Sequence, residues 1–139
     1  MRKDESLYPE DWFKMGAKEL KRAENLLEFD DLEGAGFNIQ QAIEKYLKGY
    51  LLSKGWKLRR IHELETLLNE VVGYEPSFEE FRQECLKITD YYIEERYPFT
   101  VTSELTEEEV RISLQAAKKM IDKILRLVRA KSNDDQEEK

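Results

Sequence analysis

The sequence has very few of the residues that build metal sites and covalent cross-links. Its 139 residues include one cysteine, Cys85, and one histidine, His62. A single cysteine cannot form an intramolecular disulfide, and a structural zinc site needs about four Cys or His ligands. This scarcity fits a reducing compartment, so we expect a cytoplasmic protein that uses no metal and no cofactor.

Proline, glycine and long apolar runs are also scarce. Only 3 Pro and 6 Gly occur, a composition that speaks against a collagen-like protein. The longest apolar run is a few residues, too short to span a bilayer. The start of the chain turns polar where a secretory signal would be apolar, so we expect no targeting segment and no membrane partner.

The charge balance is acidic. Lys and Arg number 23 against 30 Asp and Glu, a net charge of −7. This balance disfavours a protein that binds nucleic acid over its whole surface, but it allows a local basic patch. The length fits one domain with its own core, and we place a helical bundle at residues 8–130. Residues 131–139 are expected to form an acidic, disordered C-terminal tail, because no apolar residue follows position 131.

Apolar residues recur with helical spacing along nearly the whole chain. The predicted helices cover about 9–29, 35–54, 62–72, 77–96 and 106 to the end of the bundle. Two capping boxes, Ser77 with Glu80 and Thr106 with Glu109, indicate where the last two begin. Gly55 suits the left-handed position after a helix. The sequence therefore predicts an all-α protein: an up-and-down four-helix bundle with one additional short helix.

Motifs of the common enzyme classes are missing. The pair Gly34 and Gly36 is followed by Ile39 where a dinucleotide fingerprint needs glycine, so we interpret it as a flexible helix entrance. No Walker loop and no Gly-x-Ser-x-Gly elbow occurs. Cys85 lies in an apolar stripe with Phe81, which favours a core residue over a nucleophile.

A polar cluster interrupts the second predicted helix. Its members are separated by three, four and seven positions and so share one side of the helix: Gln41, Glu44, Lys45 and Lys48. One interpretation is a solvated face with internal ion pairs. The other is a polar seam that faces a partner or an anionic ligand.

Arg96 lies four residues after Tyr92 and extends the inward stripe of the fourth predicted helix. An arginine in that position needs a carboxylate, a carbonyl or an external anion. In a structural role, Arg96 pairs with Glu44 or Asp90 and fixes the end of the bundle. In a functional role, it binds phosphate beside stacking tyrosines.

The connection before the short helix carries a concentrated positive charge, with the basic patch Lys57, Arg59 and Arg60. Such a patch serves solubility, or it contacts RNA or an acidic protein. His62 follows it, either as the first residue of the short helix bonded to backbone or as a catalytic base.

In their order, spacing and helical context, these segments resemble the HEPN family (higher eukaryotes and prokaryotes nucleotide-binding domain). The resemblance covers roughly Trp12 to Val128. It is carried by Trp12, the run Gln41-Ala42-Ile43-Glu44-Lys45 with Lys48, His62-Glu63-Leu64, and Arg96-Tyr97-Pro98.

The resemblance implies a helical bundle that forms a homodimer. It also implies a nucleotide or RNA ligand, or a small nucleotidyltransferase partner in a toxin–antitoxin-like system. Many HEPN proteins are metal-independent RNases with an Arg followed a few residues later by His. At that spacing after Arg96 this sequence has Val101, Thr102 and Ser103. Its motif Arg96-Tyr97-Pro98 looks like that of the branch in which RNase activity is least expected.

The resemblance therefore points to a non-catalytic binding module. The residues it implies for ligand or partner contact are Gln41, Glu44, Lys45, Lys48, Arg96, Tyr97 and Pro98. One alternative is a metal-independent RNase toxin in which Arg96 and His62 meet across a dimer. Another is a purely structural dimerisation protein, because Tyr is enriched at interfaces and the chain has 7 tyrosines.

Overall fold

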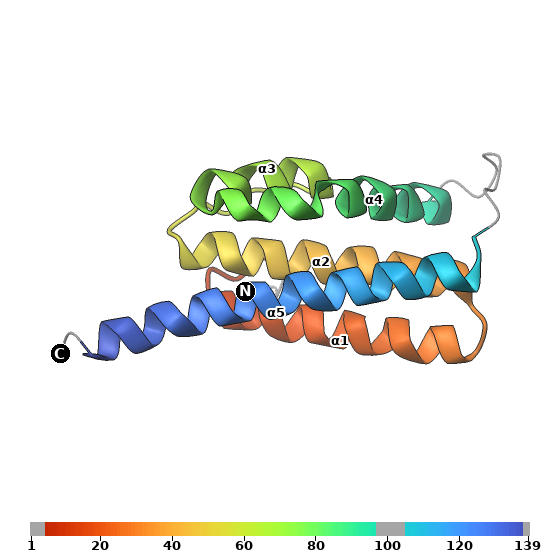
Figure 1. The fold of residues 1–139 in the computed structure, drawn as a ribbon, viewed down its shortest axis with the longest axis horizontal. Coiled ribbons are helices and arrows are strands. Elements are labelled where there is room, and N and C mark those ends of the chain that lie inside the picture. The colour runs from red at the N-terminus through yellow and green to blue at the C-terminus, as the bar shows by residue number, and fades with distance from the viewer. Residues whose placement is uncertain (1–4, 97–104, 138–139) are drawn as a thin grey trace.

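The computed structural model describes residues 5–96 and 105–137, with side chains described for 5–90 and 105–130. These ranges contain helices and no strand: α1 (Pro9–Glu28), α2 (Leu32–Ser53), α3 (Leu64–Tyr74), the 3-10 helix η2 (Pro76–Phe81), α4 (Arg82–Arg96) and α5 (Glu107–Glu137). The long helices alternate in direction along the bundle (Figure 1). The predicted all-α, up-and-down architecture with an additional short helix is confirmed.

Helix α2 lies at the centre of the bundle. It packs against α1 and α5 on one side and against α3 and α4 on the other (Figure 1). Its predicted apolar face is buried throughout: Ile39, Ala42, Ile43, Tyr46, Leu47, Tyr50 and Leu51. Because neighbours surround α2, polar residues on this helix are also drawn into the interior.

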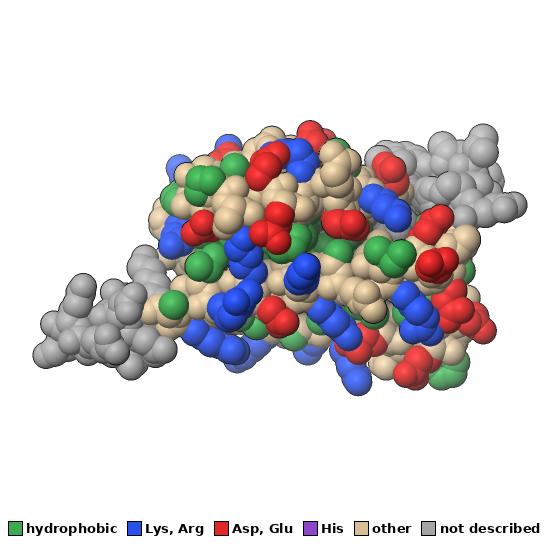
Figure 2. Space-filling view, in the orientation of Figure 1, with side chains coloured by type: hydrophobic (Ala, Val, Ile, Leu, Met, Phe, Trp, Pro, Cys, Tyr) green, Lys and Arg blue, Asp and Glu red, His purple; other side chains and the backbone are tan. Residues whose placement is uncertain are grey.

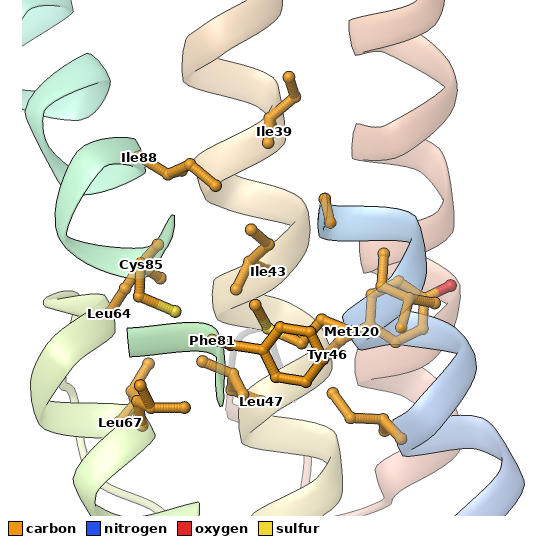
Figure 3. Close-up of a cluster of buried hydrophobic side chains, with 14 of the residues drawn as sticks. Ile39, Ile43, Tyr46, Leu47, Leu64, Leu67, Phe81, Cys85, Ile88 and Met120 are labelled. Carbon is orange, nitrogen blue, oxygen red and sulfur yellow. The ribbon is translucent and has the colours of Figure 1, made fainter. Parts of the chain in front are cut away.

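The core joins α2 to α3, α4 and α5 (Figure 3). Ile43 lies among Leu64 of α3, Cys85 of α4 and Met120 of α5. Cys85 is fully buried, as its place in the apolar stripe predicted, and burial raises the pKa of its thiol to about 12. None of the helices in the described ranges is long and apolar enough to cross a bilayer.

Two predicted helix starts were wrong by a few residues. Helix α2 begins at Leu32 instead of residue 35, because the Asp31 side chain caps it by accepting a hydrogen bond from the Gly34 amide at 2.9 Å. Helix α3 begins at Leu64, so His62 precedes the helix instead of opening it. Gly55 has φ +85°, which confirms its left-handed position after α2.

The capping box predicted at Ser77 was wrong, because Pro76–Phe81 forms the 3-10 helix and the Ser77 hydroxyl donates to Glu75. For the capping box predicted at Thr106, one of the two expected hydrogen bonds is present: the Thr106 hydroxyl accepts from the Glu109 backbone amide at 3.1 Å. Helix α4 ends at Arg96 as expected. Helix α5 continues to Glu137, whereas the sequence favoured a disordered tail from residue 131.

Candidate functional site

A pocket of about 420 Å³ lies between α1, α2 and the connection that precedes α3. Two of the predicted constellations line it. Helix α2 contributes Gln41, Glu44, Lys45 and Lys48, and the connection contributes Arg59, Arg60 and His62. We call residues 54–63 the basic connection. Segments that are separate in the sequence therefore share one cavity.

Glu44 is the centre of the charged groups in the pocket. Its side chain is 1% exposed, and its Oε2 lies 3.1 Å from Lys48 Nζ, 3.4 Å from Lys45 Nζ and 3.3 Å from His62 Nδ1. The Lys48 side chain is also buried, at 4% exposure. For Glu44 and Lys48 the solvated-face interpretation is therefore wrong, because the central position of α2 encloses them.

The second carboxylate oxygen of Glu44 differs from the first. Oε1 is buried and accepts no hydrogen bond from the described part of the chain. Buried polar atoms normally have a hydrogen-bond partner, so Oε1 differs from the other buried polar atoms of this cluster, which are paired within the described chain.

Trp12 of α1 forms one wall of the pocket. Lys48 Nζ lies 5.4 Å from the centroid of the Trp12 ring, within the range of a cation–π contact. The indole Nε1 donates to the backbone carbonyl of Ser6 at 2.8 Å, which fixes the orientation of the ring. Trp12 therefore holds Lys48 in place and also ties the N-terminal segment to the pocket.

Gln40 supports this site without lining the pocket, and the sequence did not reveal it. It is 1% exposed, and its amide donates to the backbone carbonyl of His62 at 3.2 Å. Its Oε1 accepts a hydrogen bond from Gln41 Nε2 at 2.6 Å. Gln40 thus holds the basic connection against α2. The sequence did contain a signal for this role of Gln40, because the residue lies four positions before Glu44 and interrupts the apolar face of the helix.

The side chains of the basic connection have different surroundings. Arg59 pairs with Glu70 of α3 and stacks over Trp56, with its guanidinium carbon 5.4 Å from the ring centroid. Arg60 Nη2 lies 3.3 Å from a carboxylate oxygen of Glu5. Lys57 is exposed and does not line the pocket. The His62 ring is 61% exposed, so it faces solvent as well as Glu44.

The pocket is electropositive in an acidic protein. The described lining residues include Lys45, Lys48, Arg59 and Arg60 against two carboxylates, a formal charge of +2 with His62 counted as neutral, although Arg59 also pairs with Glu70 of α3. Elsewhere the two signs are mixed, as Figure 2 shows on the face formed by α5 and α1. No group of three or more His, Cys, Asp or Glu residues in the described ranges is arranged to hold a metal ion. The arrangement suits an anion with polar substituents.

The sequence model of the HEPN domain matches residues 9–128, most of the chain. The chain belongs to the HEPN family. Among solved structures, TT1696 from Thermus thermophilus is 26% identical with a TM-score of 0.76, covering 85% of this chain and 96% of that one. ST0689, an archaeal HEPN homologue, is 24% identical with a TM-score of 0.70, covering 87% and 98%, and shows the fold alone. No curated protein matches this HEPN chain.

The Arg-Tyr-Pro segment of this HEPN chain lies outside the residues whose side chains the structure describes. Arg96 is the last residue of α4, and its side chain lies outside the described residues. Tyr97 and Pro98 also lie outside them. Helix α4 ends at the same end of the bundle as the α1–α2 turn (Figure 1). The roles of these three residues, including a pairing of Arg96 with Glu44, stay predictions.

Proposed function

We propose that this HEPN chain binds a nucleotide in the pocket between α1, α2 and the basic connection, and that it does so without catalysing a reaction. The observation that carries the proposal is the meeting of two basic segments in one pocket of about 420 Å³. Small-molecule sites typically enclose about 300–1,000 Å³ and use a few well-placed polar groups. A mononucleotide, with its phosphate, hydroxyl and base donors, fits both the volume and the charge.

The exposure of each side chain suggests its role. Lys45 is 15% exposed and Arg60 is 83% exposed, so both are accessible to a phosphate. Glu44 and Lys48 are buried behind them and set the position of Lys45. The buried Oε1 of Glu44 has no hydrogen-bond partner in the described part of the chain, and Lys45 and Arg60 are the groups that contact the ligand directly.

Binding can be tested by isothermal titration calorimetry with AMP, ATP and a short single-stranded RNA. We expect saturable binding of a nucleotide, weakened about tenfold or more in Lys45→Met, because a hydrogen bond to a charged group is lost. Lys119→Met is the matched control, since Lys119 is exposed on α5 and does not line the pocket. Equal affinities of wild type and Lys45→Met would overturn the assignment of the pocket.

Two further variants, tested with RNA, distinguish this proposal from an RNase. Metal-independent cleavage of RNA in EDTA that disappears in both His62→Ala and Arg96→Ala would replace the binding module with the catalytic alternative. Tight RNA binding without cleavage, together with no binding of AMP or ATP, would change the ligand from a nucleotide to RNA.

We also propose that the module works as a homodimer with a small nucleotidyltransferase partner in a toxin–antitoxin-like system, with Arg96, Tyr97 and Pro98 at the contact. Family membership supports this assembly. Light scattering tests the dimer, and co-expression with the product of a neighbouring nucleotidyltransferase gene tests the partner. A dimer that binds neither ligand nor partner would indicate a purely structural role.

A further inference from the structure

An ion pair joins the two sides of the pocket at its surface. A carboxylate oxygen of Glu5 lies 3.3 Å from Arg60 Nη2, and both residues line the pocket. The two are separated by 55 positions in the sequence, so the fold brings them together. Among the described residues that line this pocket, Glu5 and Glu44 are the only acidic ones.

The neighbour of Glu5 is anchored, which keeps the Glu5 carboxylate near Arg60. Ser6 is 4% exposed, and its carbonyl accepts the hydrogen bond from Trp12 Nε1 at 2.8 Å. The Ser6 hydroxyl donates to an Asp11 carboxylate oxygen at 2.6 Å. The first described residues of the chain are therefore fixed to α1 at the edge of the pocket.

The ion pair itself is weak. The side chains of Arg60 and Glu5 are 83% and 44% exposed, and exposed pairs contribute little because water screens them. A phosphate carries more charge than a carboxylate and matches the guanidinium fork with two parallel hydrogen bonds. A phosphate that enters the pocket can therefore replace the carboxylate on Arg60 at small cost.

We infer that Glu5 is an internal competitor for the ligand: its carboxylate occupies Arg60 in the free protein, and the phosphate of the bound nucleotide displaces it. This inference rests on the proposed function, because it concerns the same pocket. It makes Glu5 a residue that sets affinity without taking part in binding. Removing the carboxylate should tighten binding, whereas removing any of the pocket cations should weaken it.

The test is a double-mutant cycle of Glu5→Gln, Arg60→Gln and the double variant, titrated with AMP and with inorganic pyrophosphate. Glu5→Gln should tighten binding about two- to fivefold, the range that displacement of an exposed ion pair allows. In the Arg60→Gln background the same change should have almost no effect. Glu28→Gln is the control, because it changes the net charge equally at an exposed position that does not line the pocket.

Each outcome has a defined meaning. Unchanged affinity in Glu5→Gln, with normal binding by the wild type, overturns the competition and leaves the proposed function standing. An equal gain with and without Arg60, or an equal gain in Glu28→Gln, also overturns it, because the effect is then general charge. No binding by the wild type or by Glu5→Gln overturns the proposed function, and the competition with it.

Discussion

Replacing Glu44 by leucine is the perturbation that tests how the pocket is built. The change removes the buried carboxylate whose Oε2 lies 3.1 Å from Lys48 Nζ and 3.4 Å from Lys45 Nζ. Lys48 remains buried at 4% side-chain exposure, and its ammonium loses the carboxylate that lies 3.1 Å away. Lys45 is more exposed and can move towards solvent.

The expected loss of stability is large. Removing one member of a buried ion pair costs about 3–5 kcal/mol, because the other charge stays desolvated. For a domain of this size each kcal/mol lowers the melting temperature by about 3 °C, so Glu44→Leu should melt about 10–15 °C lower. Replacing both charges with apolar residues should be far milder, since burial of an ion pair is itself costly.

The assay is urea unfolding of Glu44→Leu, Lys48→Met and the double variant. We expect the double variant to be more stable than Glu44→Leu alone, with a coupling energy of about 2 kcal/mol or more. A Glu44→Leu protein as stable as the wild type would refute the buried pair. Strictly additive losses would refute the coupling between the two side chains.

Three further predictions concern the bundle itself. Burial raises the pKa of the Cys85 thiol to about 12 from its ordinary 9.0, so above pH 9 the folded chain retains the thiol proton while the unfolded chain loses it. The free energy of unfolding should therefore fall as the pH rises above 9. Iodoacetamide should label Cys85 only when the protein unfolds. A constant free energy of unfolding from pH 8 to pH 11 would contradict this. Gly16→Ala should lower the free energy of unfolding, measured in urea, by about 1–3 kcal/mol, because the added Cβ would lie 2.6 Å from Tyr46 Cδ2. Gly73→Ala should raise it by about 0.5–1 kcal/mol, because no atom lies within 4 Å of the added Cβ. Thr106→Ala should cost about 1 kcal/mol by loss of the α5 cap, and an unchanged melting temperature would contradict it.

The fold could be predicted because its signals are local and repeated. The seven apolar positions of α2 cover so much of the helix that only a central place in the bundle can bury them. The helix starts were less certain, because Asp31 and Ser77 both precede plausible first turns. Only Asp31 caps its helix, while Pro76 begins a 3-10 helix that precludes the box predicted at Ser77.

The pocket could be predicted only in part, because it depends on contacts that are distant in the sequence. Spacing placed Glu44, Lys45 and Lys48 on one side of a helix but could not show that two of them are buried. The contact of Gln40 with the His62 carbonyl joins residues 22 positions apart, and Glu5 with Arg60 joins residues 55 apart. No periodicity within one helix carries that information.

A nuclear magnetic resonance titration of the labelled protein with AMP tests the central claim most directly, because it locates the ligand. Nucleotide binding in the pocket predicts saturable shifts at Lys45, Arg60 and His62, with little change in α5. Saturable shifts confined to other surfaces, or no shifts at millimolar AMP, would contradict the assignment of this pocket as the nucleotide site.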